Sequence, residues 1–304
     1  MRLIAWWMLL AAAMVAAPPA AAQSIPFADT EDATLSEIEV DDADFHPVVS
    51  VDLRNGDYAR GALDDDDAGL GRVPLHVALG GAAAIHRRAD GRANVFLIGQ
   101  SSNGFHAPAD DERARPRAWY ESNNLLGLAW RPVDGLNAAA TYTIKISPNG
   151  VAPTTHEASL TVLYSADDGL GRLKPRAAVT RRTRGDGGFY TIAGIAPSFD
   201  LSERERGPSI SLPVTIGIGW RGFYAAGSGD RLFGSAGVSL ARPMRLGRAN
   251  ATLQAEMLGL LRDDRLRRLD APGGTTATIV PSAGGSRDSA WSTTAGHRDR
   301  PSRP

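Results

Sequence analysis

Apolar and polar residues alternate one for one along several stretches of this chain. From Leu136 to Ser147, Leu, Ala, Tyr and Ile side chains occupy every second position, and Asn, Thr, Lys and Ser side chains occupy most of the positions between them. The same period of two runs through Ser209 to Arg221 and Ala158 to Ser165. Because successive side chains of a strand point to opposite faces, this period predicts β-strands with one apolar and one polar face.

Weaker alternation predicts further strands, separated by Gly, Asp, Asn and Pro. These strands are Pro47 to Arg54, Val73 to His86, Arg92 to Ser102, Trp119 to Arg131, Arg172 to Thr183, Gly188 to Leu201, Leu232 to Pro243, Ala249 to Leu261 and Gly274 to Pro281. Together the runs make about twelve strands, within a range of roughly 10 to 14. We therefore predict an all-β fold, an antiparallel up-and-down transmembrane β-barrel over residues 46–281.

The alternation does not say which face of the strands turns inward. In a membrane barrel the apolar face meets lipid, whereas a soluble periplasmic or secreted β-barrel or sandwich would hide Leu212, Val214 and Ile216 around an apolar ligand. Aromatic residues gather near the predicted strand ends, as in the two girdles of a membrane barrel. On the predicted outer side they are Trp119, Tyr120, Phe189, Tyr190, Phe223, Tyr224 and Phe233, and on the opposite side Trp130 and Phe199. We favour the membrane barrel and keep the soluble barrel as the alternative.

The two ends of the chain differ in composition from the predicted barrel. Residues 1–22 combine Arg2, an apolar run and the small residues Ala20 to Ala22, which is typical of a cleaved signal peptide. Acidic residues crowd residues 23–45, which predicts a mobile linker, and residues 282–304 are polar and rich in Arg, which predicts a disordered tail. Export together with a barrel predicts the outer membrane of a Gram-negative bacterium.

The composition argues against several kinds of chemistry. The formal net charge of −1 over 304 residues gives no general attraction to nucleic acid, and the absence of cysteine excludes disulfides and thiolate chemistry. His76 and His86 lie on one predicted strand about 33 Å apart, too far to share a metal. No metalloprotease, phosphate-loop or nucleophile-elbow motif occurs. We expect no metal, no cofactor and no catalysis; an outer-membrane lipid-modifying enzyme, which needs a Ser and a His near one rim, is the third hypothesis.

A polar lumen would make the polar faces of the strands the candidate binding surface. The residues predicted to face it are Asn137, Thr141, Thr143, Lys145, Ser159, Thr161, Thr215, Thr252, Gln254 and Glu256. Such small polar side chains, with one Lys and one Glu, are typical of a narrow or weakly selective interior. A barrel of twelve strands is wider than the eight-stranded barrels that side chains fill and narrower than the open channels of sixteen or more strands. Its width therefore does not decide whether it conducts. Beside a predicted outer loop, Arg181, Arg182 and Arg184 are candidates to pair with lipopolysaccharide phosphates.

The second half of the chain resembles a known kind of barrel. The segments TYTIKISPNG, HEASLTVLYSADD, GFYTIAGIAPSFDL, SISLPVTIGIG and RLFGSAGVSLARPM resemble strands of the TorF-type porins, in the same order. The resemblance covers the region from Trp119 to Leu261, about half of the chain. It implies an outer-membrane barrel of unassigned substrate and transfers no site residues.

The leading hypothesis is a passive pore or structural protein of the outer membrane. Its expected partners are outer-membrane lipid, lipopolysaccharide and, during biogenesis, the barrel-assembly machinery. Barrels of this kind usually end on a strand whose last residue is aromatic, whereas this chain ends on a polar segment from Ala283. That segment is either a disordered extension after a strand at Thr275 to Val280 or the product of an altered reading frame.

Overall fold

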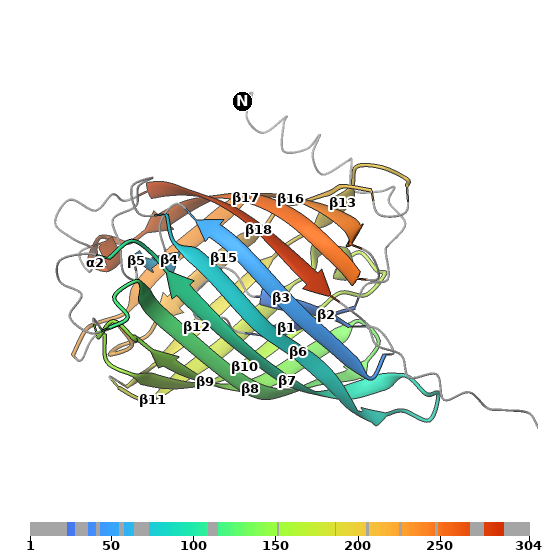
Figure 1. The fold of residues 1–304 in the computed structure, drawn as a ribbon, viewed down its shortest axis with the longest axis horizontal. Coiled ribbons are helices and arrows are strands. Elements are labelled where there is room, and N and C mark those ends of the chain that lie inside the picture. Colours follow the sequence, from blue (N-terminus) through green and yellow to red (C-terminus); the bar gives the residue numbers. More distant parts are fainter. Residues whose placement is uncertain are drawn as a thin grey trace, which may run out of the picture.

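Antiparallel strands form most of the chain in a computed structural model and wind into a barrel (Figure 1). The described residues are 23–27, 36–40, 43–54, 58–63, 73–108, 115–150, 152–185, 187–204, 207–224, 227–246, 249–267 and 277–288. The predicted signal peptide lies outside them, as do residues 289–304 of the predicted tail. Within the described part of the chain, no helix is long and apolar enough to cross a membrane.

The barrel strands follow one another around the ring in chain order. They are β3 (Phe45–Arg54), β6 (Leu75–Arg87), β7 (Ala93–Phe105), β8 (Trp119–Val133), β9 (Leu136–Ile146), β10 (Thr155–Tyr164), β11 (Arg176–Arg184), β12 (Gly188–Ile195) with β13 (Ser198–Asp200), β14 (Ser209–Ser211) with β15 (Val214–Gly219), β16 (Arg231–Leu246), β17 (Ala249–Arg262) and β18 (Ala277–Asp288). Each pairs antiparallel with the next, and β18 pairs with β3. The pairings therefore form a closed ring.

Two of the barrel strands are interrupted, each at a proline. Pro197 separates β12 from β13, and Pro213 separates β14 from β15, because proline has no N–H to give to the ladder. The two halves stay in register across the break, where the amide of Leu212 donates to the carbonyl of Pro197 at 3.0 Å. The sheet of 14 strands is thus a barrel of twelve, and the predicted fold class is confirmed.

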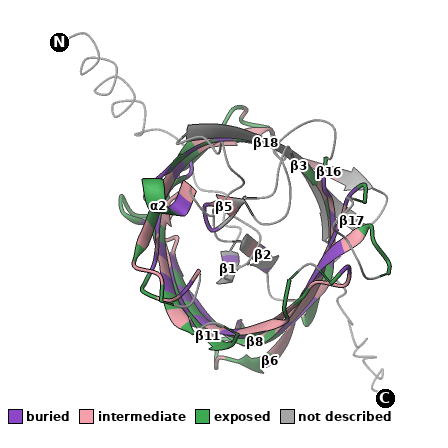
Figure 2. Ribbon diagram, turned by 90° about the vertical axis from the view of Figure 1, so that its left-hand side faces the viewer, coloured by how far each residue is buried: buried purple, intermediate pink, exposed green. Residues whose placement is uncertain are grey.

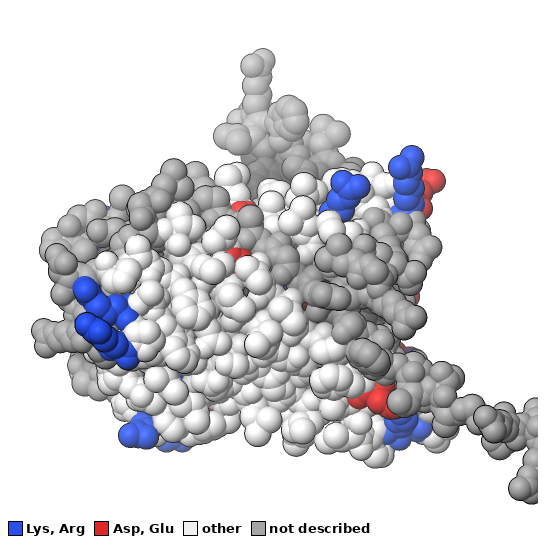
Figure 3. Space-filling model, viewed as in Figure 1, with Lys and Arg blue, Asp and Glu red and all other residues white. Residues whose placement is uncertain are grey.

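The outer surface of the barrel is apolar and its inner surface is mostly polar. Leu126 and Ile216 point outward and are 61% and 57% exposed, whereas Thr161 and Thr180 point inward and are 0% and 1% exposed. Charged side chains on the face seen in Figure 3 lie mainly near the two ends of the barrel. Val214, also exposed, lies outside with Ile216, so these residues do not line the apolar cavity that the soluble alternative requires.

The connections divide the barrel into two ends. Those that follow β3, β7, β9, β11, β15 and β17 leave from one end, which we call the long-loop end. Those that follow β6, β8, β10, β13 and β16 leave from the other, the short-turn end. The long-loop end carries the short helix α2 (Asp264–Arg267), and the short-turn end carries the single turn η3 (Gly171–Leu173).

Two hairpins stand inside the ring (Figure 2). β1 (Gln23–Phe27) and β2 (Ser36–Val40) form a two-stranded sheet, which we call the N-terminal hairpin. β4 (Tyr58–Ala59) and β5 (Ala62–Leu63) form the second, the loop hairpin, within the connection from β3 to β6. The prediction that residues 23–45 are a mobile linker is therefore wrong for the strands of the N-terminal hairpin and for the start of β3, because the barrel wall gives them partners that an isolated acidic segment lacks.

The last barrel strand is longer than the sequence predicts. β18 runs to Asp288 and pairs with β17 on one side and β3 on the other. The prediction of a disordered tail from residue 282 is therefore wrong for residues 282–288. Its residues from Ser282 to Ser286 are all small, so they carry little apolar signal, but the two neighbouring strands pair with their backbone.

Candidate functional site: the lumen of the barrel

The structure places the residues that the sequence predicts to face the lumen on the inner side of the wall. Asn137, Thr141, Thr143, Ser159, Thr161 and Thr215 are buried there, and Lys145, Thr252, Gln254 and Glu256 share the inward face of their strands with more exposure. They do not form one site, because β15 and β17 are separated from β10 by other strands of the ring. That they bind a solute stays a prediction.

Strands β9 to β11 bring inward hydroxyl groups together. Ser159 lies opposite Thr141 across the ladder, and its hydroxyl is 2.8 Å from that of Thr180. The hydroxyls of Thr141 and Thr161 are buried and have no hydrogen-bond partner among the described residues. These inward hydroxyl groups, which we call the hydroxyl wall, keep hydrogen-bonding capacity that the described residues do not use.

The N-terminal hairpin covers this part of the lumen. β1 lies along β9 and β10, and β2 places Ile38 and Val40 in a buried cluster with wall residues such as Phe96 and Ile98. Within β2, Glu37 forms an ion pair with Arg176, at 2.6 Å, where β11 begins at the short-turn end. Apolar packing and one ion pair therefore hold the hairpin against the inner wall.

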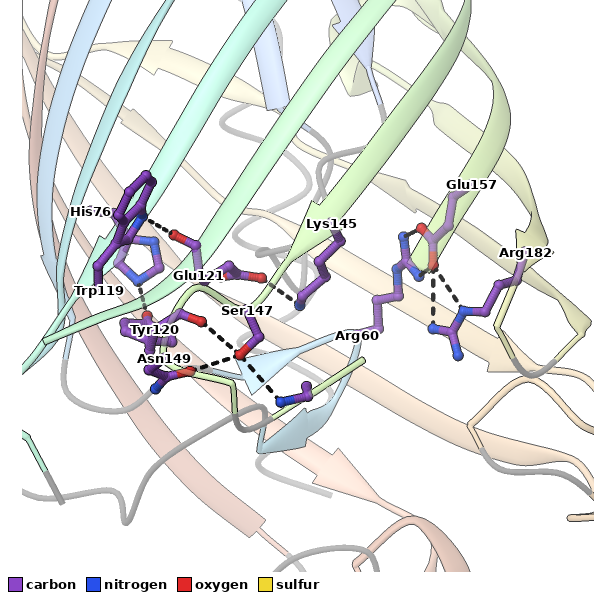
Figure 4. Close-up of polar contacts among 11 residues, drawn as sticks. Arg60, His76, Trp119, Tyr120, Glu121, Lys145, Ser147, Asn149, Glu157 and Arg182 are labelled. Atoms are coloured by element: carbon purple, nitrogen blue, oxygen red, sulfur yellow. Dashed lines mark hydrogen bonds and ion pairs between the residues drawn. The ribbon is translucent and has the colours of Figure 1, made fainter. Parts of the chain in front are cut away.

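The loop hairpin occupies the lumen at the long-loop end. Arg60, in its turn, is only 6% exposed and donates two hydrogen bonds to the carboxylate of Glu157, which is 2% exposed. The distances are 2.9 Å from Nη1 to Oε1 and 2.5 Å from Nη2 to Oε2 (Figure 4). Burial disfavours the charge on the Arg60 guanidinium, but the neighbouring Glu157 carboxylate outweighs this and raises the pKa of Arg60 above its ordinary value.

Arg182 shares the carboxylate of Glu157. Its Nε and Nη2 atoms each lie 3.3 Å from Oε1 of Glu157, and its Nη1 donates to the carbonyl of Phe223 at 2.8 Å. The suggestion that Arg182 contacts lipopolysaccharide is therefore wrong, because this side chain points into the lumen. A bulge at Thr183, opposite the step from His156 to Glu157, separates inward Arg182 from outward Arg184.

Arg181 and Arg184 lie on the outer face instead. Arg181 is exposed, with its guanidinium carbon 5.5 Å from the centre of the Phe189 ring. Arg184 lies 3.4 Å from the imidazole of His156, whose other nitrogen is 2.8 Å from the hydroxyl of Tyr142. Both arginines lie near the end of β11 at the long-loop end, and their pairing with lipopolysaccharide stays a prediction.

A second polar cluster lies on β6 and β8. The hydroxyl of Tyr120 is 2.7 Å from Nε2 of His76, and the ring of His106 stacks on the Tyr120 ring at 4.4 Å. A bulge where β7 pairs with β8 turns both Tyr120 and Glu121 inward, and Glu121 forms an ion pair with Lys145 (Figure 4). No group of three or more His, Cys, Asp or Glu side chains able to hold a metal occurs among the described residues.

Several aromatic residues assigned to a girdle belong to the lumen. Tyr190, Phe223 and Phe233 are buried inside the barrel in one apolar cluster with Leu258 and Leu260. Tyr120 is buried as well. The girdle prediction is wrong for these four residues and for Tyr224, which packs against the same cluster, because position along a strand does not reveal which face a side chain takes. Trp119 stacks on Phe105 at 6.2 Å, and Phe189 is exposed on the outer face.

The central ion pair of the lumen has no signal in the sequence. Arg60 and Glu157 are 97 positions apart, and neither belongs to a motif. The dipeptide Arg60-Gly61 gives a local indication of the turn alone, since two-residue hairpin turns favour Gly at the second position.

No protein-family model matches this chain, and no curated protein matches it. Several solved structures, including the following three, align with most of it at low identity. LpxR from Salmonella typhimurium is 11% identical, with a TM-score of 0.38, over 81% of this chain and 100% of LpxR. A bacterial polysaccharide outer membrane secretin is 7% identical, with a TM-score of 0.38, over 81% and 98% of the two chains. A FadL homologue from Pseudomonas aeruginosa is 12% identical, with a TM-score of 0.33, over 80% and 88%. These likenesses are too weak to assign a function, and the resemblance to TorF-type porins stays a prediction.

Proposed function

We propose that this protein is an outer-membrane β-barrel whose lumen is a solute pathway, closed in the described conformation by the two hairpins. The polarity of the wall carries the proposal. Large apolar side chains such as Leu126 and Ile216 are exposed on the outside, where water would disfavour them and lipid would not. Hydroxyl groups such as those of Thr161 and Thr180 are buried on the inside.

The contacts of the hairpins support a closed pathway rather than a permanently open one. The N-terminal hairpin packs on the wall through Ile38 and Val40, and the loop hairpin is held by Arg60 and Glu157. Neither hairpin belongs to the barrel ring, so each can leave the lumen without breaking a barrel ladder. The sequence-based hypothesis of a passive pore is thereby narrowed to a pore that opens when a hairpin moves.

Cell fractionation followed by gel mobility before and after boiling tests the membrane part of the proposal. We expect the full chain in the outer-membrane fraction, with a mobility shift on boiling. Recovery from the periplasm without a shift would overturn it.

Planar-bilayer recordings of the purified barrel then test the pathway. We expect low conductance with rare openings from the wild-type protein and frequent openings when either hairpin is unseated. A barrel that stays closed in both cases would contradict a solute pathway and leave a structural membrane protein.

A further inference from the structure

Arg60 lies in a box of one carboxylate and two aromatic rings. Both carboxylate oxygens of Glu157 accept hydrogen bonds from it, as described above. The guanidinium carbon also lies 5.0 Å from the centre of the Tyr190 ring and 5.2 Å from that of Phe223. A two-pronged carboxylate contact with aromatic faces suits the flat, forked guanidinium better than a compact ammonium group.

The walls of this box are held without help from Arg60. Tyr190 stacks on Phe223 at 5.4 Å and on Phe233 at 6.4 Å. Arg182 fixes both Oε1 of Glu157 and the backbone carbonyl of Phe223. Oε2 of Glu157, in contrast, accepts its hydrogen bond from Arg60. The box is therefore preorganised: its residues are held by contacts with one another and with Arg182, and the Arg60 guanidinium fills the space between them.

Arg60 has a backbone conformation that is energetically unfavourable for a residue with a long side chain. Arg60 has φ of +52° and Gly61 has φ of +79°, which makes both residues left-handed in a two-residue hairpin turn. Gly, Asn and Asp are the residues that ordinarily take such conformations, and a long side chain takes them rarely. The contacts with Glu157 and the two rings offset this strain, as at many ligand-binding positions.

We infer that Glu157, Tyr190 and Phe223 form a guanidinium-binding site in the lumen, that Arg60 is its built-in occupant, and that solutes bearing a guanidinium group compete with Arg60 for it. The inference rests on the proposed function, because it names the class of solute that the closed pathway recognises. Displacement of Arg60 by such a solute removes the side-chain contacts that hold the loop hairpin inside.

Arg60→Gly empties the site and, like displacement by a solute, loosens the hairpin without removing all of its contacts. Glycine suits the left-handed turn, and two backbone contacts stay: the Tyr224 hydroxyl donates to the carbonyl of residue 60 at 2.7 Å, and Arg262 donates to the carbonyl of Gly61 at 3.4 Å. With the purified full chain in detergent, titration calorimetry measures the binding of methylguanidinium, with methylammonium at equal ionic strength as the control cation. We expect saturable methylguanidinium binding to Arg60→Gly, about tenfold or more tighter than methylammonium binding.

The double variant Arg60→Gly with Glu157→Gln is the matched control, because it keeps the shape of the box and removes its charge. We expect methylguanidinium affinity to fall by about tenfold or more in this variant. Equal affinity for the two cations, or equal affinity in the single and double variants, would overturn the inference. A mobility shift on boiling checks that each variant is folded.

A measurement on the wild-type protein needs no variant. Methylguanidinium at millimolar concentration is expected to increase proteolysis of the loop hairpin, whereas methylammonium at equal ionic strength is not. Identical proteolysis with both cations would overturn the inference. These readouts measure binding alone, so a barrel that binds methylguanidinium without conducting would refute the proposed pathway and leave the site standing.

Discussion

Gly61, at the tip of the loop hairpin, lies directly against the ring of Phe233 on β16. A Cβ atom added to Gly61 would come within 2.5 Å of this ring, and the φ of +79° would strain any other residue. Gly61→Ala is therefore expected to push the hairpin tip out of the lumen while Arg60 is retained. In planar bilayers, we expect more frequent openings than in the wild-type protein.

Gly91→Ala is the control for this variant. Gly91 has a similar φ of +85°, but a Cβ added there meets nothing within 4 Å. It lies in the turn between β6 and β7, at the opposite end of the barrel. Conductance of Gly91→Ala should equal that of the wild-type protein. If Gly91→Ala opens as often as Gly61→Ala, the effect does not come from the contact with Phe233.

Ile38 tests the N-terminal hairpin. This side chain is 3% exposed within the apolar cluster that includes Phe96 and Ile98. Ile38→Asp buries a carboxylate without a partner, so the hairpin is expected to leave the wall, with increased conductance and faster proteolysis of residues 23–40. Ile38→Val keeps the packing at a cost of about 0.5–1.5 kcal/mol and is expected to stay closed. Faster proteolysis of Ile38→Asp at unchanged conductance would show that the N-terminal hairpin does not close the lumen.

Leu126 tests the lipid-facing surface. It is 61% exposed near the middle of β8. In a bilayer, Leu126→Arg is expected to lower the free energy of unfolding by about 2–4 kcal/mol, because the charge lies near the membrane midplane. Leu201→Arg, at a residue 55% exposed just beyond β13, is expected to cost about 0–1 kcal/mol because it lies near the interface. Urea titration in lipid vesicles measures both, and equal costs would argue against a lipid-facing belt.

Asp168, in the turn between β10 and β11, is expected to make the stability of the fold depend on pH. Its carboxylate accepts hydrogen bonds from the Tyr164 hydroxyl and the Gly171 amide, both at 2.6 Å. The hydrogen bond from Tyr164 makes the largest contribution, and that from Gly171 the next, to lowering the pKa of Asp168 below its ordinary value of 3.8. The ionised group therefore stabilises the fold fully above that value, and this contribution is lost as the pH falls through the lowered pKa.

Asp168→Asn removes this titration and keeps an acceptor for the Gly171 amide. We expect the urea midpoint of the wild-type protein to fall more than that of Asp168→Asn between neutral and acidic pH. The comparison is made in the same detergent at each pH. An equal acid-side loss in both proteins would contradict the role of this carboxylate.

The number and order of the strands could be predicted because a period of two is a local property. Leu136 to Ser147 alternates clearly enough to place β9 to within one residue of its observed end. The ends of other strands were less certain where glycine and proline weaken the pattern. β18 was predicted to end at Pro281, although its neighbours continue to pair with it as far as Asp288.

The contents of the lumen could not be predicted in the same way. The bulges at Thr183 and Tyr120 each change the face that the following residue takes, and alternation has no means of anticipating them. Strand β2 of the N-terminal hairpin carries Ile38 and Val40 as an alternating apolar pair between acidic residues, and the partners of this pair lie on wall strands that follow later in the chain. Long-range burial, not local propensity, gives these residues their structure.

The pairing of β3 with β18 also means that the ring can close only after the last barrel strand has been made. β3 is the first strand of the ring to be synthesised and β18 is the last, so β3 and β17 keep open edges until Ala277–Asp288 arrives. Open edges recruit other strands, including those of neighbouring chains. The N-terminal hairpin, made before any of the wall, has no enclosure until that moment. Until β18 has paired with both neighbours, the edges of β3 and β17 need shielding and the ring that surrounds the two hairpins is incomplete.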